Sequence, residues 1–265
     1  MITAKPFIKY AGGKTSILPE LIKRVPASYN TYHEAFVGGG ALFFAQQRWA
    51  IISDINYPLI ITYQSLQYYL EEVIHELEYH ARQHEEDPDH YYNVRYCFNT
   101  GYHCPWQVAG AFIYLNKTCY NGLYRVNKKG EFNVPKGKQK NVTICDIETL
   151  TAASVALQGI TIKCCDFRTI EKRKGDFYYL DPPYYNAYAK YDSSSFTADD
   201  HMDLRNVCGE IDLAGGYFML SNSDTEFIRN LYFGYNIETV LAKRSVSRDK
   251  TQRGKVNELI IRNYE

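Results

Sequence analysis

The sequence predicts an α/β fold whose nucleotide-binding sheet is interrupted by an insertion. Residues 32–36 are a short strand-like run, 37–40 form a glycine turn, and 41–49 continue with apolar residues at helical spacing. The next strand-like run, 50–53, is followed by a carboxylate. A strand, a glycine loop, a helix, a strand and an acid in this order are typical of the start of a nucleotide-binding sheet. The same alternation returns from residue 160, so an insertion lies between the two parts.

The insertion has a different pattern. Helical spacing extends over residues 57–84 and again over 105–116. Two β-prone runs, 123–126 and 131–134, then flank a polar Asn-Lys-Lys-Gly turn. Turn residues between two such runs predict a β-hairpin.

Beyond the insertion the α/β pattern continues to the end of the sequence. The chain therefore divides into an expected catalytic domain, residues 1–58 with 145–265, and a small inserted domain, residues 59–144. In the catalytic domain, further strands are expected at 160–163, 177–180, 217–221 and 256–262, and a helix at 200–214.

Composition limits the class of protein. With 265 residues and 45% hydrophobic content, the chain can bury one large core. No window of about 18 uncharged apolar residues occurs, and no apolar segment typical of a secretory signal stands at the N-terminus. Seven cysteines without a regular spacing favour a reduced, cytoplasmic compartment over a disulfide scaffold. The group Cys97, His103, Cys104 and Cys119 matches no zinc-binding spacing, so we expect no metal.

The distribution of charge bears on the partner. A formal net charge of zero by itself argues against nucleic acid. Basic residues nevertheless concentrate in two stretches, 116–140 and 243–255, whereas acids gather at 71–89. Basic stretches are commonly solvated surface, but two of them in a chain with 25 tyrosines also fit a phosphate-binding face whose rings stack on bases.

The clearest chemical signal is the segment Phe-Tyr-Tyr-Leu-Asp-Pro-Pro-Tyr at 177–184. An apolar strand delivers Asp181 to its carboxyl end, and two prolines hold the backbone extended with free carbonyl acceptors. Methylation of a base amino group needs such parts. Acceptors at Asp181 and at the Pro182 carbonyl favour a pyramidal nitrogen, and the Tyr184 ring supports a base flipped out of the stack. The alternative is a plain Pro-Pro turn with a buried tyrosine.

Glycines after the first strand predict a ligand site. Gly38 and Gly40 let the backbone approach a ligand, and the following helix points its N–H groups toward the same place. Asp54, at the end of the next strand, stands where a carboxylate can bind a ribose. This pattern alone also fits a NAD site, although Phe43 occupies the position of the third glycine in that motif.

The N-terminal segment FIKYAGGKT at 7–15 is similar to the end of a phosphate-binding P-loop. The match fails because Ile8 stands at the position of the first glycine and because too few residues precede the segment for a full strand. The alternative is an N-terminal arm whose glycines pack over a cofactor, with Lys14 facing the cofactor's carboxylate.

Several segments occur in an order that is known from other proteins. They are FIKYAGGK at 7–14, EAFVGGGALFF at 34–44, SDIN at 53–56, YNGLYRVNKKGEFNVPKG at 120–137, DPPY at 181–184, SFT at 195–197 and LSNSD at 220–224. Together they resemble the Dam family of DNA adenine methyltransferases over nearly the whole chain. The order of cofactor motif, recognition insert and catalytic motif is that of the alpha group.

The resemblance implies a fold and an activity. The fold is the class I AdoMet-dependent methyltransferase sheet, Rossmann-like, with an inserted helical and β-hairpin domain that recognises DNA. The methyl donor is S-adenosyl-L-methionine (AdoMet), the partner is double-stranded DNA, and the target is the N6 amino group of the adenine in GATC. Transfer is direct, so neither a cysteine nucleophile nor a metal is expected.

The resemblance also implies roles for single residues. Asp181, Pro182 and Tyr184 are the expected catalytic residues. Tyr10 stands where enteric members of the family have tryptophan, which keeps an aromatic ring of different shape. The expected cofactor-binding residues are Tyr10, Lys14, Phe36, Gly38, Gly40, Asp54, Asp166, Phe167 and Asp181.

Contacts with DNA are expected from the N-terminal arm and the hairpin. Lys9 and Arg125 resemble base-reading residues, Pro135 a further base contact, and Tyr120 an aromatic residue that inserts into the stack. The alternative for Tyr120 is a core residue of the hairpin. The full expected set is Lys9, Tyr120, Asn121, Leu123, Arg125 and Pro135.

Other functions remain open at this point. A related enzyme could methylate cytosine N4 or RNA, but the hairpin argues against it. A DNA-binding relative that has lost transfer would keep the fold, but the complete Asp181–Tyr184 motif argues against it. The sequence is compatible with a solitary regulator, with the partner of a cognate restriction endonuclease, and with a protein of bacterial or phage origin.

Overall fold

The computed structural model describes residues 3–46, 49–139, 141–185, 196–243 and 255–265. Packing divides the chain into two compact units. One, here called the helical unit, comprises Met1–Gly13, Gly38–Gln47 and Asn56–Cys164; the other, the sheet unit, comprises Lys14–Val37, Arg48–Ile55 and Cys165–Glu265. The helical unit therefore contains more than the residues 59–144 that were expected as the insertion, since it also takes in the N-terminal arm and the glycine loop.

Within the described residues, seven strands form one sheet of order β3-β2-β1-β4-β5-β7-β6. The neighbours β2, β1, β4 and β5 run parallel, whereas β7 is antiparallel to both β5 and β6. This arrangement confirms the expected α/β fold. The strands are β1 (Tyr32–Glu34), β2 (Ala50–Asp54), β3 (Thr161–Cys164), β4 (Phe177–Leu180), β5 (Tyr217–Ser223), β6 (Asn236–Lys243) and β7 (Lys255–Arg262).

The strand order places a switch point between β1 and β4. From β1 the chain proceeds to β2 on one side, whereas β4 leads to β5 on the other. At such a point the loops that leave neighbouring parallel strands diverge, which creates a site for a ligand at the carboxyl ends. All four residues of β4 are buried. The residues that follow β1 and β4 are therefore the ones that the fold assigns to a site.

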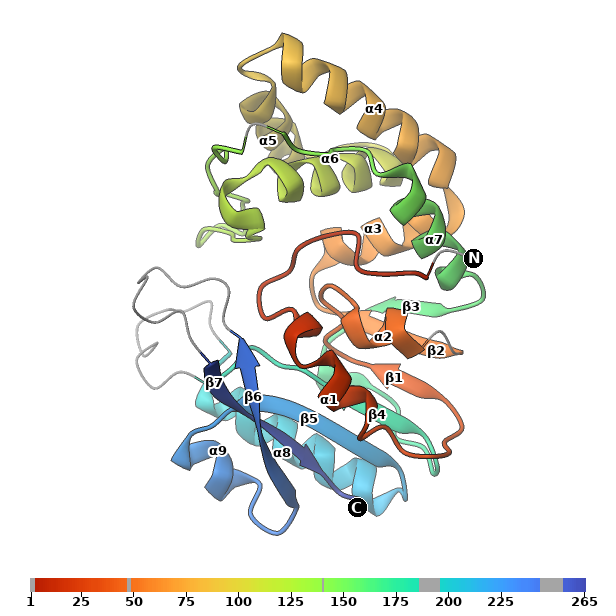
Figure 1. Cartoon of the computed structure of the whole chain (residues 1–265), viewed down its shortest axis with the longest axis vertical. Helices are drawn as coiled ribbons and strands as arrows, with labels where there is room; N and C mark the ends of the chain where they lie inside the picture. The colour runs from red at the N-terminus through yellow and green to blue at the C-terminus, as the bar shows by residue number, and fades with distance from the viewer. Residues whose placement is uncertain (1–2, 47–48, 140, 186–195, 244–254) are drawn as a thin grey trace. The chain divides into compact units, whose positions relative to one another are not determined.

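Helices cover the sheet unit and complete its core (Figure 1). Helix α8 (Ala198–Leu213) packs against β5, and its N-terminus is fixed by a capping box between Thr197 and Asp200. The shared core contains Tyr178 and Leu180 of β4 and Leu204 of α8, all fully buried. The remaining helical segments of this unit are η1 (Lys14–Ser16), α1 (Leu18–Ile22), η3 (Phe167–Thr169) and α9 (Glu226–Leu231).

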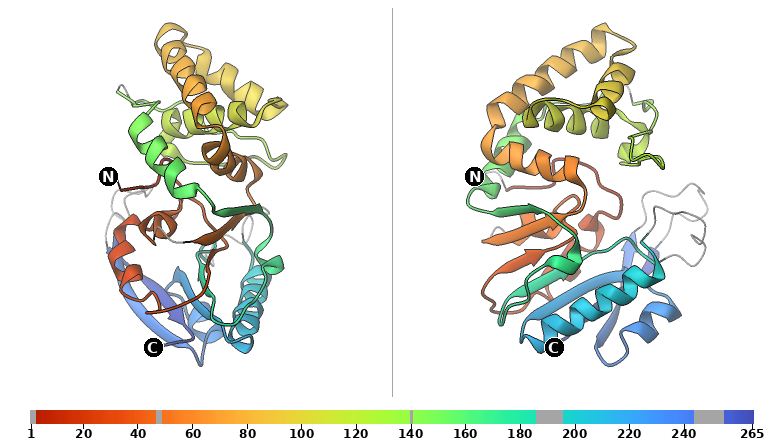
Figure 2. Two further views of the ribbon diagram at one scale, coloured as in Figure 1. Left: turned by 90° about the vertical axis from the view of Figure 1, so that its right-hand side faces the viewer. Right: turned by 180° about the vertical axis from the view of Figure 1, so that it is seen from behind.

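The helical unit is built around α6 (Pro105–Thr118), which packs against α3, α4 and α5 (Figure 2). The single helix expected over residues 57–84 is two helices, because the backbone leaves the helical region at Tyr69. Asn56 caps the first of them by accepting from the Leu59 N–H. The helices of this unit are α2 (Ala41–Gln46), α3 (Tyr57–Tyr68), α4 (Leu70–Glu86), α5 (His90–Thr100), α6, η2 (Tyr120–Gly122) and α7 (Ile147–Leu157).

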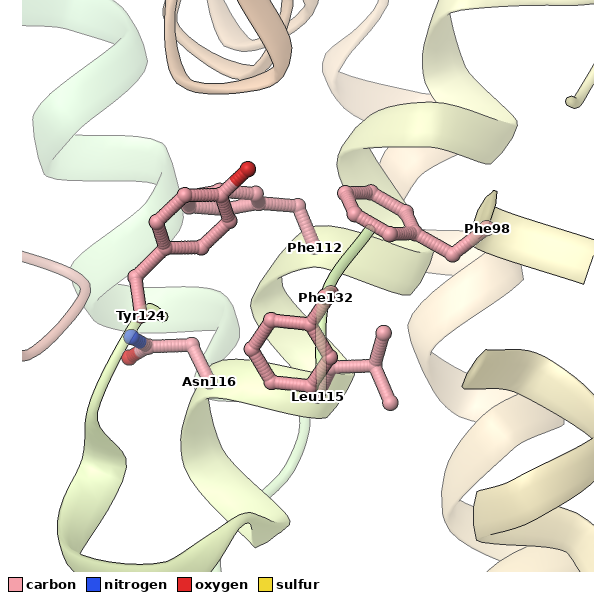
Figure 3. Close-up of a pocket in the computed structure, with 6 residues that line it drawn as sticks. All are labelled: Phe98, Phe112, Leu115, Asn116, Tyr124 and Phe132. Carbon is pink, nitrogen blue, oxygen red and sulfur yellow. The ribbon is translucent and has the colours of Figure 1, made fainter. Parts of the chain in front are cut away.

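The expected hairpin is present as an antiparallel return with isolated bridges in place of a regular ladder. At its base Cys119 pairs with Lys136, and at its tip Val126 pairs with Phe132. An aromatic cluster anchors it: the Tyr124 ring lies 5.3 Å from that of Phe112 on α6 and 5.7 Å from that of Phe132 (Figure 3). Packing against α6 therefore takes the place of strand pairing.

Two expectations about the whole chain can be compared with the structure. All seven cysteines are free, as the sequence predicts. None of the helices in the described part of the chain is long and apolar enough to span a membrane.

Candidate active site

The centre of the candidate site is Asp181, which directly follows the buried strand β4 in the sheet unit. The Nζ atom of Lys14 lies 2.9 Å from its Oδ2 atom. Lys14 is 5% exposed, so this ion pair is shielded from water. The pair joins residues that lie far apart in the sequence and fixes the start of η1 at the carboxyl end of β4.

The electrostatic state of Asp181 is set by its surroundings. Burial raises the pKa of its carboxyl group to about 6, with the Lys14 ammonium acting in the opposite direction and Glu258 adding a small repulsion. At neutral pH the group is therefore an anion in a poorly hydrated place. Its second oxygen, Oδ1, is buried and has no hydrogen-bond partner among the described residues. A buried carboxylate oxygen without a donor is costly, and a ligand that brings an N–H group would satisfy it.

Tyr184 supplies an aromatic surface beside this carboxylate. The Lys14 Nζ atom lies 4.7 Å from the centroid of its ring, which is a cation–π distance. The Tyr184 hydroxyl donates a hydrogen bond of 2.8 Å to Oε2 of Glu258. An ammonium group thus stands over the ring and donates to the Asp181 carboxylate. An amino group of a base stacked on this ring would likewise need an acceptor for its N–H groups beside the ring.

Pro182 is buried, and the segment that follows it is held by β5. The Tyr185 N–H donates to Oδ1 of Asn222 at 3.2 Å, and the Ser223 hydroxyl donates to the Tyr185 carbonyl at 2.9 Å. Sequence reasoning gave no role to Glu258, Asn222 or Ser223. The segment LSNSD at 220–224 contains two of them and was the signal that could have indicated them.

The carboxyl ends of β1 and β2 gather further predicted residues in the sheet unit. The Val37 N–H donates to the Ser53 carbonyl, and the Cys165 N–H donates to the carbonyl of Asp54. These bonds bring the loop after β1, the end of β2 and the segment that leads to Asp166 to one edge of the sheet. The predicted residues Phe36, Asp54, Asp166 and Phe167 therefore lie in one region of this unit.

The side chains in this region differ in how accessible they are. The Phe167 ring is buried and packs at 5.3 Å from Phe36 and 5.5 Å from Phe196. The Asp166 carboxylate is partly occupied, since it caps η3 and accepts hydrogen bonds from the Arg168 side chain. Phe36 and Asp54 are half-buried.

The glycine loop belongs to the helical unit, where it meets the N-terminal arm. Gly38 adopts a left-handed φ of 46°, and a Cβ atom built there would lie 2.9 Å from the Tyr10 ring. A side chain at this position would displace Tyr10. The Tyr10 hydroxyl accepts a hydrogen bond of 3.0 Å from Asn56, and Gly40 has a φ of 68°. The structure thus brings Tyr10, Gly38 and Gly40 together.

Lys9 is held by the helix that precedes the hairpin. Its N–H donates to Oδ1 of Asn116 at 2.9 Å, and Nδ2 of Asn116 donates to the Lys9 carbonyl at 2.7 Å. The same Nδ2 atom also donates to the carbonyl of Gly122 at 3.3 Å. A Cβ atom on Gly122 would lie 2.7 Å from Cδ of Lys9, so the stem of the lysine fits against this glycine. One buried side chain therefore fixes the arm to the turn that follows α6.

The predicted DNA residues of the hairpin lie at its surface. Tyr120 is 53% exposed, so it is not the core residue of the alternative interpretation. Asn121 has a φ of 58°, the one left-handed φ outside glycine among the described residues. Leu123 is half-buried, and Pro135 is exposed while its carbonyl accepts from the Tyr120 N–H. The turn is thus closed at its base and presents an aromatic ring outward.

Arg125 is exposed, and a neighbour orients it. Its Nε atom donates to Oδ1 of Asn133 at 2.8 Å across the hairpin. Lys128 and Lys129 at the tip are exposed. Lys136, in contrast, is half-buried and donates to the Pro88 carbonyl, so it is less available than the sequence suggests.

Two further sequence observations can be located. Of the second basic stretch, residues 244–254 lie outside the described residues, as does Lys140 of the first. The described part of the chain contains no group of three or more His, Cys, Asp or Glu side chains that could hold a metal ion.

Comparisons with known proteins agree on one family. The sequence profile of the D12 class of N6 adenine-specific DNA methyltransferases matches residues 10–246. A Type II methyltransferase, M.MjaIII, of Methanocaldococcus jannaschii is 40% identical, over 98% of this chain and 99% of that protein. A second Type II methyltransferase, M1.LlaDCHI, of Lactococcus lactis subsp. cremoris is 36% identical over 99% and 96%. A DNA adenine methylase of Serratia marcescens is 32% identical over 97% of each chain.

Proposed function

Because the chain belongs to the D12 class of N6 adenine-specific DNA methyltransferases, we propose that it methylates the adenine of GATC in duplex DNA with AdoMet as donor. Membership confirms the family, the enzyme class and the class I methyltransferase fold that the sequence predicts. The observation that carries the proposal is the Oδ1 atom of Asp181, a buried acceptor beside the Tyr184 ring that has no hydrogen-bond partner in the part of the chain that the structure describes.

The chemistry assigned to this chain is positioning and polarisation. AdoMet, when bound, supplies a methyl group on a positively charged sulfur. The Asp181 carboxylate and the Pro182 carbonyl accept the two hydrogens of the adenine amino group, which localises the nitrogen lone pair for attack. As the N–C bond forms, the carbon–sulfur bond breaks with its electron pair going to sulfur, and positive charge develops on the nitrogen, where the adjacent carboxylate stabilises it in a poorly hydrated site. The nitrogen then loses one proton to solvent, which leaves a neutral methylamino group. The Tyr184 ring holds the extruded base and offsets part of the cost of unstacking.

The residues of the sheet unit also fit the donor. Asp54 ends β2 at the edge of the sheet where Rossmann-like folds bind a ribose, and Phe36 offers a half-buried ring in the same region. Lys14 offers a buried ammonium for a carboxylate. Asp166 and Phe167 are the further proposed cofactor residues of the sheet unit. In the helical unit, the proposed cofactor residues are Tyr10, Gly38 and Gly40.

The proposed reading of DNA rests on the helical unit. Asn116 holds the backbone of Lys9 and that of Gly122 together, so the arm and the Tyr120 turn form one rigid surface. Asn133 orients Arg125 for a guanine edge. Tyr120 is exposed for insertion into the base stack, with Asn121, Leu123 and Pro135 beside it. In functional terms we keep residues 59–144 as the recognition domain and residues 1–58 with 145–265 as the catalytic domain.

A transfer assay tests the proposed function. The full-length protein is incubated with tritiated AdoMet and duplexes that contain GATC or a scrambled site, and the DNA is digested to nucleosides. Label in N6-methyladenine from the GATC duplex supports the proposal. Label in N4-methylcytosine, label on RNA alone, or DNA binding without any label would each contradict it in favour of one of the alternatives.

The proposed ribose contact gives a prediction for binding. Asp54→Ala is expected to weaken AdoMet binding roughly tenfold or more, since a hydrogen-bonded charged group contributes about 1.5–3 kcal/mol. Isothermal titration of the unreacted protein with AdoMet measures this without reference to activity. Glu210→Ala removes an exposed carboxylate of α8 in the same unit and is the matched control. Equal affinity in Asp54→Ala and in the unaltered protein would rule out this assignment.

The hairpin gives a prediction for specificity. Arg125→Ala is expected to relax discrimination at one outer base pair by about 1–3 kcal/mol, the value of a bidentate contact with guanine. Lys128→Ala is expected to weaken binding to all duplexes alike and to flatten the salt dependence, because a lysine at the exposed tip contacts phosphate. Both variants are compared on GATC and on each single-base change. A uniform loss in Arg125→Ala with unchanged preference would mean that this arginine contacts the backbone.

A further inference from the structure

The proposed function needs the plane of the Tyr184 ring to be fixed, and the structure shows what fixes it. The ring ends in a hydroxyl that donates 2.8 Å to Oε2 of Glu258. Glu258 lies in the middle of β7, where it pairs with Ser223 of β5 and Val240 of β6. Because β7 has a neighbour on each side, the backbone of this acceptor is held by two ladders. The Cα atom from which the accepting side chain extends is therefore fixed by the sheet.

The backbone after the ring is held by the neighbouring strand. Asn222 is fully buried at the end of β5, and its Oδ1 atom accepts the Tyr185 N–H. Ser223, one residue further, donates to the carbonyl of the same Tyr185. The backbone N–H and the carbonyl of Tyr185 are thus both bound by side chains of two consecutive residues of β5. The segment from Asp181 to Tyr185 is anchored at β4, at β5 and at β7.

We propose that Glu258, together with Asn222 and Ser223, positions the Tyr184 ring for stacking with the extruded adenine. The inference rests on the proposed function and extends it to residues outside the Asp181–Tyr184 motif. Without the bond to Glu258 the ring can turn about its side-chain torsions, and a base stacked on it would lose its alignment with Asp181. Small misplacements of this kind lower the rate of a reaction that depends on orientation.

The charge of Glu258 is compatible with this role. Burial, followed by the nearby carboxylates of Asp181 and Glu258, raises the pKa of the Tyr184 hydroxyl well above its usual value. The phenol therefore stays protonated and keeps donating over the whole working pH range. What the role requires is an acceptor at position 258. A negative charge there is not required.

A double-mutant cycle separates anchoring from a general structural effect. The variants are Tyr184→Phe, Glu258→Ala and both together, with Glu258→Gln as the conservative variant that keeps an acceptor oxygen. We expect Glu258→Ala and Tyr184→Phe each to lower kcat roughly ten- to hundredfold with unchanged AdoMet affinity, because a ring that turns freely misplaces the base and the rate depends on its alignment. The double variant should be no worse than either single one, and Glu258→Gln should stay within about threefold of the unaltered protein.

A second readout follows the base itself. A duplex with 2-aminopurine at the target adenine fluoresces when the base leaves the stack and is quenched when it stacks on a ring. Glu258→Ala and Tyr184→Phe should both give brighter emission than the unaltered protein, whereas Glu210→Ala, which removes an exposed carboxylate on α8, should not. Thermal unfolding shows whether Glu258→Ala is folded. If it is not, Tyr184→Phe still tests the proposal, because this substitution leaves β7 unchanged.

The outcomes separate the two claims. If the unaltered protein places no methyl group on DNA adenine, the proposed function fails whatever the variants do. If it does methylate adenine, additive losses in the cycle, a Glu258→Gln variant as poor as Glu258→Ala, or unchanged emission in Tyr184→Phe would overturn the positioning role alone.

Discussion

Replacing Asp181 with alanine is expected to lower methyl transfer by roughly 10²–10³-fold, the range for the loss of one preorganised group that stabilises developing charge. The two oxygens of the carboxylate differ: Oδ2 binds Lys14, whereas Oδ1 is a buried acceptor that no other described residue satisfies. Alanine removes both. Single-turnover transfer to a GATC duplex measures the chemical step, and circular dichroism with thermal unfolding shows whether the variant is folded.

Asp181→Asn makes the test sharper. The amide has nearly the same shape and keeps one acceptor oxygen, so the fold and the position of Tyr184 should survive while the charge is lost. Asp199→Ala, at an exposed position at the start of α8, is the control for loss of a carboxylate. If Asp181→Ala transferred methyl groups within tenfold of the unaltered protein, the role proposed for this residue would be wrong.

The sheet was predictable because its strands carry a strong pattern. Residues 177–180 and 217–221 are short apolar runs that end in polar residues, and the structure buries them in β4 and β5. Strand β6 was missed because its sequence, NIETVLAK, shows neither a continuous apolar run nor a regular alternation: two polar residues stand together at 238–239 and three apolar ones at 240–242. Helix α5 was missed because its sequence is rich in tyrosine and asparagine, which have low helix propensity. Packing against α6 stabilises α5, and the ladder with β7 stabilises β6; neither long-range contact can be read from the local sequence.

The candidate site was predictable in its parts but not in its connections. The sequence assigned Lys14 to the cofactor and Asp181 to catalysis. Their ion pair joins residues that lie far apart in the sequence, so no local pattern indicates it. The same holds for Asn116, a polar residue inside an apolar helix that binds Lys9 and Gly122. Glu258 stands between Asn257 and Leu259 in a strand, where an acid is normally a solvent-facing residue. These contacts join residues that come together only in the folded chain, so the structure is needed to find them.

The ion pair between Lys14 and Asp181 leads to a prediction about pH. Burial raises the pKa of Asp181 to about 6, and the Lys14 ammonium keeps it from rising further. The carboxylate is the form that accepts the amino hydrogens, so transfer should be lost as the pH falls through this value. Lys14→Met removes the opposing charge while keeping most of the side-chain volume. The pKa of Asp181 must then rise, and a larger fraction of the protein is protonated and inactive at neutral pH.

We therefore expect the acidic limb of the kcat/KM profile for DNA to move to higher pH in Lys14→Met, with most of the lost activity regained in alkaline buffer. Below the pKa, each unit of displacement lowers kcat/KM about tenfold. Rates are measured from acidic to alkaline pH at low DNA concentration and saturating AdoMet, with AdoMet affinity determined separately because Lys14 is also a proposed cofactor residue. Lys23→Met, which removes an exposed lysine just after α1, should leave the profile unchanged. A loss of equal size at every pH would show that Lys14 acts on the cofactor and does not control the charge of Asp181.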